Sequence, residues 1–197
     1  MTIPDGYTDL PPGKIASIVT YLEMRRPPEV IAESEAYGWV LTPHPHPDVE
    51  WYRRLFRTIG QDWLWFSRLQ MTDEELRSII HDSRVDVFAL EFEGRERGIL
   101  ELDRREMPDI ELAFIGLTHD LIGRGAGRFL MDRALQIAWS HQPDRLLVHT
   151  CTLDHSRALD FYRKVGFVPY KRAIEVADDP RVDGTLPRTA APSIPIL

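Results

Sequence analysis

The chain has 197 residues, of which 43% are hydrophobic and 28% charged, so it can bury one sizeable core and we expect a single domain, 1–197. Its formal net charge is -7 and its basic residues are scattered, which disfavours nucleic acid as a partner. We expect no membrane partner and no secretory signal, and the single cysteine, Cys151, favours a reducing, cytoplasmic compartment.

The N-terminal part of the chain predicts one strand followed by a loop. The β-branched and apolar run Ala16–Met24 is typical of a strand. Residues 32–47 read as a loop, in which His44 and His46 alternate with prolines. Because no cysteine or carboxylate pattern accompanies these histidines, we expect a solvated turn there rather than a metal site.

Two amphipathic helices should follow. Asp48 begins the first, whose apolar residues recur at i, i+3, i+4 and i+7 before Gly60 ends it. Thr72 and Glu75 form a capping box for the second.

The middle of the chain predicts three strands. Val85–Phe92 and Gly98–Leu102 are separated by a short polar turn, which predicts a hairpin. The third, Asp109–Leu117, is apolar enough to predict burial on both of its faces.

Two more helices and two more strands are expected in the C-terminal half. The first of these helices should present Arg128, Asp132 and Gln136 to solvent. The second should take its N-cap from residues 154–156 and end at Gly166. The two strands are Leu146–Thr152 and Val168–Val176.

This order of elements, with a hairpin early and a β-α-β arrangement late, indicates an α/β fold on a mixed sheet. We expect residues 1–13 to be a flexible lead and residues 177–197 to be a proline-rich tail. Such a tail cannot form a core of its own, so order in it requires contact with the domain or with a neighbouring copy.

The most informative segment contains three glycines at every second position, Gly123, Gly125 and Gly127. They stand between an apolar strand and an amphipathic helix. A helix start offers unpaired amide donors and a partial positive charge, and glycines let a phosphate approach the backbone closely. The segment predicts a pyrophosphate-binding turn, the alternative being a turn that serves only chain geometry.

Two segments together resemble the GNAT acetyltransferases. Ile122–Gly127 is similar to the family's Q/R-x-x-G-x-G/A loop, with Ile122 in place of Gln or Arg. His155–Phe167 is similar to the family's N-x-x-A-x-x-F/L-Y-x-K-x-G-F block, with His155 in place of Asn. The resemblance is strong over residues 100–170 and weak in the first half. It implies a GNAT-like fold, a mixed and mostly antiparallel sheet of about six to seven strands flanked by about four helices.

The resemblance also implies acetyl-CoA as co-substrate, with no metal. The backbone N–H of Leu117 would contact the acetyl oxygen, and Thr118 and His119 would line the pantetheine arm. Tyr162 would be the general acid, the alternative being a packed core tyrosine. The residues implied in coenzyme binding are Leu117, Thr118, His119, Ile122, Gly123, Arg124, Gly125, Ala126, Gly127, Arg128, His155, Arg157 and Tyr162.

Glu111 aligns with the carboxylate that takes the amine proton in part of the superfamily. Its neighbours Ile110 and Leu112 predict an apolar environment for it. A structural salt bridge is the alternative role. His149 and Cys151, on the next strand, could act as the base instead.

The acceptor is the least determined part. In this fold Trp63, Trp65, Phe66 and Arg68 would border the acceptor groove, where aromatic rings could hold an ammonium group, although they could equally be core. The sequence thus predicts acetyl transfer to a primary amine of a small molecule or protein, in a protein that could be a homodimer. The alternatives are a non-catalytic acyl-CoA sensor and an interaction module on the same fold.

Overall fold

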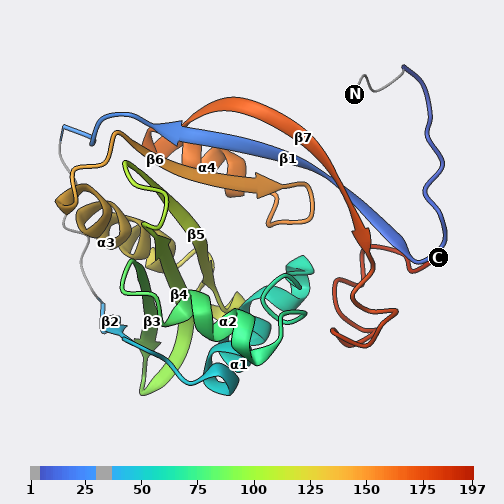
Figure 1. Ribbon diagram of the computed structural model, residues 1–197, viewed down its shortest axis with the longest axis horizontal. Helices are drawn as coiled ribbons and strands as arrows, with labels where there is room; N and C mark the ends of the chain where they lie inside the picture. Colours follow the sequence, from blue (N-terminus) through green and yellow to red (C-terminus); the bar gives the residue numbers. More distant parts are fainter. Residues whose placement is uncertain (1–4, 30–36) are drawn as a thin grey trace.

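The computed structural model describes residues 5–29 and 37–197, so parts of the expected lead and of the expected loop lie outside the described residues. A seven-stranded sheet in the order β2-β3-β4-β5-β6-β1-β7 runs through the described part of the chain (Figure 1). This mixed α/β architecture confirms the expected fold class. The strands are β1 (Lys14–Met24), β2 (Val40–Pro43), β3 (Val85–Phe92), β4 (Arg95–Asp103), β5 (Asp109–Leu117), β6 (Arg145–Cys151) and β7 (Val168–Asp178). The helices are α1 (Val49–Gly60), α2 (Asp73–Ile80), α3 (Ala126–Ser140) and α4 (Ala158–Val165).

Strand β2 corrects the interpretation of residues 32–47 as a loop. Val40 lies opposite Glu91 and Pro43 opposite Phe88, so β2 pairs antiparallel with β3. The strand is only four residues long and ends at a proline, so its sequence carries little strand signal. Residues 30–36 of this region lie outside the described residues.

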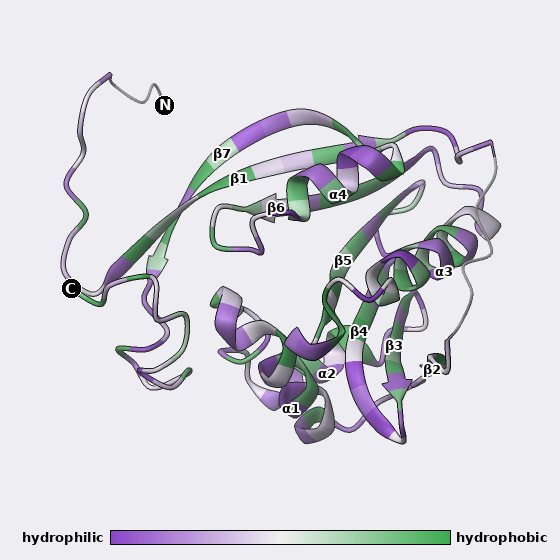
Figure 2. Cartoon of the chain, turned by 180° about the vertical axis from the view of Figure 1, so that it is seen from behind, coloured by the Kyte–Doolittle hydropathy of each residue, from purple (hydrophilic) through white to green (hydrophobic). Residues whose placement is uncertain are grey.

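The first strand of the chain, β1, lies between the two strands that come last in the sequence, β6 and β7. β1 pairs antiparallel with β6, where Tyr21 faces His149, and with β7, where Ser17 faces Glu175. Both views show β6, β1 and β7 curving away from β3–β5 (Figure 1; Figure 2). β1 therefore brings N-terminal side chains next to residues from the end of the chain.

Helices cover both faces of β3–β5. Ile99 belongs to the core beneath α1 and α2, whereas its neighbour Leu100 belongs to the core beneath α3 and α4. This alternation is the strand period of two. Asp132 of α3, expected at the solvent face, is only 2% exposed and forms an ion pair with Arg128 at 2.8 Å. Pairing with the adjacent turn of the helix keeps this buried carboxylate satisfied.

Strand β5 is paired with β6 only in its N-terminal part. Its parallel ladder with β6 ends where Glu111 lies opposite Leu147. Beyond this point the two strands separate, and residues 113–117 are only partly buried. The expected burial of β5 on both faces is therefore wrong for its second half, because one edge of that half lines a cleft.

A bulge in β5 changes which face its side chains occupy. Glu101 of β4 pairs with Phe114, but the next pair is Leu102 with Leu112, which leaves Ala113 as the extra residue. As a result Leu112 packs on the α3 side and Phe114 on the α1 side.

Residues 179–197 fold back onto the domain. The Arg181 guanidinium donates hydrogen bonds to the backbone carbonyls of Ala190, Ala191 and Ile194, and it pairs with Asp179 at 2.7 Å. The tail thus forms a compact turn around one buried cation and rests on its own domain. The small core that joins them consists of Ile15, Leu64, Leu186, Ala190 and Ala191.

Candidate active site

A cleft of about 1130 Å³ lies where β5 and β6 separate. It is lined by the end of β5, the glycine turn before α3, one side of α4 and the segment between α1 and α2. Because the ladder between β5 and β6 stops at Glu111, the β5 edge beyond it offers backbone amides and carbonyls to a ligand. The cleft is large enough for an extended coenzyme.

The glycine turn has the geometry that phosphate binding requires. Gly123 and Gly125 adopt positive φ angles of 84° and 93°, and Gly125 is the N-cap of α3. The two amides after Gly127 both donate to the carbonyl of Gly125. The amides of Ala126 and Gly127 are therefore the donors that a helix start leaves for a ligand.

The cleft gathers most of the residues that the sequence assigned to the coenzyme. Nine of them line it: Leu117, Ile122, Gly123, Gly125, Gly127, Arg128, His155, Arg157 and Tyr162. The lining does not include Thr118, His119, Arg124 and Ala126. Ala126 is fully buried and can offer only its backbone N–H, whereas the N–H of Thr118 already donates to the carbonyl of Arg97.

Tyr162 lines the cleft from α4 and is 8% exposed. Its ring packs against Phe161 and Phe167, at centroid distances of 5.8 and 6.0 Å. Burial raises the pKa of the phenol well above its ordinary value, and the nearby charge of Asp154 raises it further. The hydroxyl therefore stays protonated at neutral pH and can serve as a proton donor.

Asp154 does not have the helix-capping role that was expected of residues 154–156. Its carboxylate accepts hydrogen bonds from Thr150 Oγ1 at 2.7 Å and from the backbone N–H of Cys151 at 2.8 Å. It does not cap α4, whose N-cap is Arg157 with no side-chain capping bond. The Arg157 N–H donates instead to Nδ1 of His155 at 3.1 Å. The expected N-cap at residues 154–156 is therefore wrong by one position.

Glu111 forms an ion pair with His149, with 3.2 Å between Oε1 and Nδ1. The two side chains are 45% and 46% exposed, so the expected apolar environment of Glu111 is wrong. Ile110 and Leu112 lie on the opposite, buried face of the strand. His149 lines the cleft, whereas Glu111 is absent from the lining.

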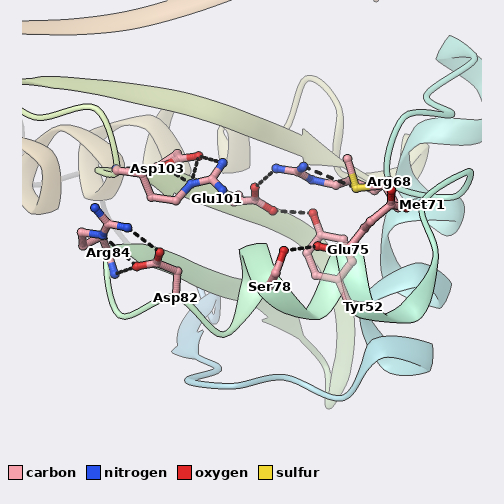
Figure 3. A network of polar contacts seen from close by, with 10 residues as sticks. Tyr52, Arg68, Met71, Glu75, Ser78, Asp82, Arg84, Glu101 and Asp103 are labelled. Atoms are coloured by element: carbon pink, nitrogen blue, oxygen red, sulfur yellow. Dashed lines mark hydrogen bonds and ion pairs between the residues drawn. The ribbon is translucent and has the colours of Figure 1, made fainter.

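Three of the four residues expected at the acceptor groove, Trp63, Trp65 and Phe66, line the cleft. Arg68 does not. Its guanidinium is buried, pairs with Glu101 at 2.5 Å and lies 5.2 Å from the centroid of the Phe114 ring. Tyr52 donates its hydroxyl to the same carboxylate, which is fully buried (Figure 3). Arg68 is therefore an anchor for the segment that carries the aromatic residues.

No residue of β1 or β7 was expected by name to line the cleft. The only available signal was strand alternation, which gives the face of a residue but not the neighbouring strand. The additional lining residues from these strands are Val19, Tyr21, Ala173, Ile174, Glu175 and Val176.

Two further features of the described residues concern metals and membranes. Within residues 5–29 and 37–197, no group of three or more His, Cys, Asp or Glu side chains could hold a metal ion. In the same part of the chain, every helix is too short or too polar to cross a membrane.

Comparison with known proteins agrees with the fold. The family model described as Acetyltransferase (GNAT) family matches residues 47–167. The chain therefore belongs to the GNAT acetyltransferases, a family of acyltransferases that use acetyl-CoA. No curated protein matches the chain.

Solved structures share the fold at low sequence identity. A GNAT-family protein from Novosphingobium aromaticivorans has a TM-score of 0.57 and 14% identity over 86% of this chain and 68% of its own. A GCN5-related N-acetyltransferase from Kribbella flavida has a TM-score of 0.55 and 16% identity over 84% of this chain. The present chain spans only 60% of the Kribbella protein. A GNAT acetyltransferase from Elizabethkingia anophelis, solved with acetyl-CoA bound, has a TM-score of 0.51 and 15% identity over 68% of this chain and 78% of its own.

Proposed function

We propose that the protein is an N-acetyltransferase that transfers the acetyl group of acetyl-CoA directly to a primary amine of a small molecule or protein. The observation that carries the proposal is the continuity of the cleft. It connects the glycine turn at the start of α3 with the free edge of β5 and with the phenol of Tyr162. Groups that can bind the pyrophosphate, polarise the acetyl carbonyl and donate a proton thus lie along one cavity.

Each part of the co-substrate has a partner in this proposal. The free amides of Ala126 and Gly127 bind the pyrophosphate, helped by the half-exposed Arg128 and by Arg157. The backbone N–H of Leu117, at the free edge of β5, polarises the acetyl carbonyl. Ile122 cannot donate a side-chain hydrogen bond, so binding at this turn depends on the backbone.

The chemistry requires an acid and a base. Tyr162, whose raised pKa keeps the hydroxyl protonated at neutral pH, gives its proton to the departing thiolate. The ion pair of Glu111 and His149 contains the base. The acceptor enters past Trp63, Trp65 and Phe66, whose rings can hold an ammonium group.

A non-catalytic acyl-CoA sensor is the second candidate, because Glu111 itself does not line the cleft. The position of Tyr162 in the lining favours the enzyme instead. We further propose a cytoplasmic location, since Cys151 is a free thiol. A homodimer remains a prediction.

The deciding experiment measures thiol release from acetyl-CoA across a library of primary amines, alongside calorimetric binding of acetyl-CoA. Turnover with at least one amine supports the enzyme. Tight binding with no amine-dependent thiol release would identify a sensor, and absence of binding would refute both.

A further inference from the structure

His149 and Glu111 lie on the two strands that separate to form the cleft. His149 belongs to β6 and Glu111 to β5, and 3.2 Å separates Nδ1 of the imidazole from Oε1 of the carboxylate. Only His149 lines the cleft. A molecule in the cleft therefore meets His149, whose imidazole is paired with a carboxylate that lies outside the lining.

This contact determines which ring nitrogen can accept a proton. An ionised carboxylate has no proton to donate, so the imidazole must donate from Nδ1. In the neutral ring, Nε2 then carries the free lone pair. The Tyr21 ring lies 5.7 Å from the imidazole, which restricts the ring on the β1 side.

The surroundings of His149 favour the protonated ring. The hydrogen bond that His149 donates to Glu111 raises the pKa of His149 most, partial burial lowers it, and the charges of Glu111, Asp154 and Glu175 raise it again. On the β7 side, the Lys171 ammonium lies 4.6 Å from the centroid of the Tyr21 ring, which is itself next to the imidazole. The balance raises the pKa of His149 above its ordinary value of 6.5.

We propose that His149 accepts the amine proton at Nε2 and that Glu111 is a positioning residue that orients the imidazole through Nδ1. This inference rests on the acetyl transfer proposed above. It gives Glu111 an indirect role, because Glu111 does not line the cleft.

The proton balance of the reaction is complete. The acceptor arrives as an ammonium ion and gives one proton to Nε2 of His149, and the freed nitrogen lone pair forms a bond to the thioester carbon. The C–S bond breaks, and the Tyr162 hydroxyl gives its proton to the sulfur. The second proton lost by the nitrogen restores the phenol, and the imidazolium releases its proton to solvent.

The test compares His149→Gln and Glu111→Gln in the full-length protein, using acetyl-CoA and an amine found by the thiol-release screen. The readout is kcat/KM as a function of pH. His149→Gln should lower kcat by about 10²-fold and abolish the low-pH limb of the profile. Glu111→Gln should lower kcat by about tenfold and keep the limb, moved to lower pH, because the imidazole keeps its lone pair but loses the adjacent charge.

Glu175→Gln is the matched control, because it removes a nearby carboxylate that contributes charge but no hydrogen bond to His149. It should shift the limb less than Glu111→Gln does. The opposite pattern, with the limb abolished by Glu111→Gln and retained by His149→Gln, would overturn the proposal by making Glu111 the base.

A second measurement does not depend on turnover or on the stability of a variant. Nitrogen-15 NMR of the wild-type imidazole reports which nitrogen carries the proton in the neutral ring. We expect the proton on Nδ1. A proton on Nε2 would refute His149 as the base even if amines are acetylated. Absence of turnover with every amine, together with a proton on Nδ1, would refute the proposed function and with it the catalytic role of His149.

Discussion

Trp65 donates its indole N–H to Oδ1 of Asp154 over 3.1 Å, and this bond joins two walls of the cleft. Trp65 lies between α1 and α2, and Asp154 lies between β6 and α4. The same carboxylate also accepts from Thr150 and Cys151. One side chain therefore fixes the aromatic segment relative to the strand that carries His149.

The glycine turn gives the first prediction. Gly125→Val should weaken acetyl-CoA binding at least about tenfold, or ~1.4 kcal/mol. Gly125 has a φ of 93°, and a Cβ there would lie 3.3 Å from the Trp39 ring, so a branched side chain distorts the backbone that contacts the phosphates. Calorimetry measures the affinity.

The matched control is Gly94→Val in the β3–β4 turn, which also has a positive φ, of 70°, but no atom near its Cβ. It imposes similar backbone strain at a distance from the cleft and should leave the affinity unchanged. Equal losses in both variants would assign the effect to strain alone.

Tyr162→Phe tests the general acid. We expect kcat to fall by about 10²-fold while the affinity for acetyl-CoA stays nearly constant, because phenylalanine keeps the packing against Phe161 and Phe167 and removes only the hydroxyl. Steady-state kinetics and calorimetry separate the two quantities. An unchanged kcat would make Tyr162 a core residue.

Local sequence patterns predicted the individual helices well, because the capping bonds that define a helix end act within one or two helical turns. Asp48 begins α1 by accepting the N–H of Trp51 at 2.9 Å, and Thr72 with Glu75 forms the expected capping box. The sheet order could not be predicted in this way. Periodicity places Tyr21 on a strand face, but only long-range pairing places β1 between β6 and β7.

The candidate site was predictable where backbone geometry defines it and not where partners come from distant segments. Gly123 and Gly125 have the positive φ angles that a tight turn favours. The sequence left Arg68 open between an acceptor residue and a core residue, because its partner Glu101 is 33 positions away, on a strand of unknown register. The separation of Glu111 from the cleft likewise follows from the way β5 and β6 diverge.

The buried ion pair of Arg68 and Glu101 predicts a large stability effect. Arg68→Met should lower the free energy of unfolding by about 3–5 kcal/mol, because it leaves a fully buried carboxylate without its cation. Urea denaturation measures the change. Adding Glu101→Gln should restore much of the loss, since the amide still accepts from Tyr52 without requiring a countercharge. Additive losses in the double variant would contradict this explanation.

Arg181 predicts the behaviour of the tail. Arg181→Met removes the donors that hold three carbonyls and leaves Asp179 buried without its cation, so residues 180–197 should detach. Hydrogen exchange should then increase in the tail and around Leu64, against which the tail packs. Arg188→Met, at an exposed arginine of the same tail, should leave the exchange unchanged. Unaltered exchange in Arg181→Met would show that apolar packing alone holds the tail.

The ion pair of His149 and Glu111 predicts that the effect of Glu111→Gln on stability depends on pH. Folding raises the pKa of His149, chiefly through its hydrogen bond with Glu111. The contribution of the imidazolium is therefore complete below the unfolded value of about 6.5 and disappears as the pH rises through the folded value.

Removing the carboxylate should accordingly lower the melting temperature more at about pH 6 than at about pH 9. Both side chains are nearly half exposed, so solvent screens the pair and the difference should be modest. Glu175→Gln, which removes a charge without a hydrogen bond, should show a smaller change of the same sign. If Glu111→Gln instead lowers the melting temperature equally at both pH values, the carboxylate stabilises the fold by a contact that does not involve the charge of His149, and the imidazole is not held as proposed.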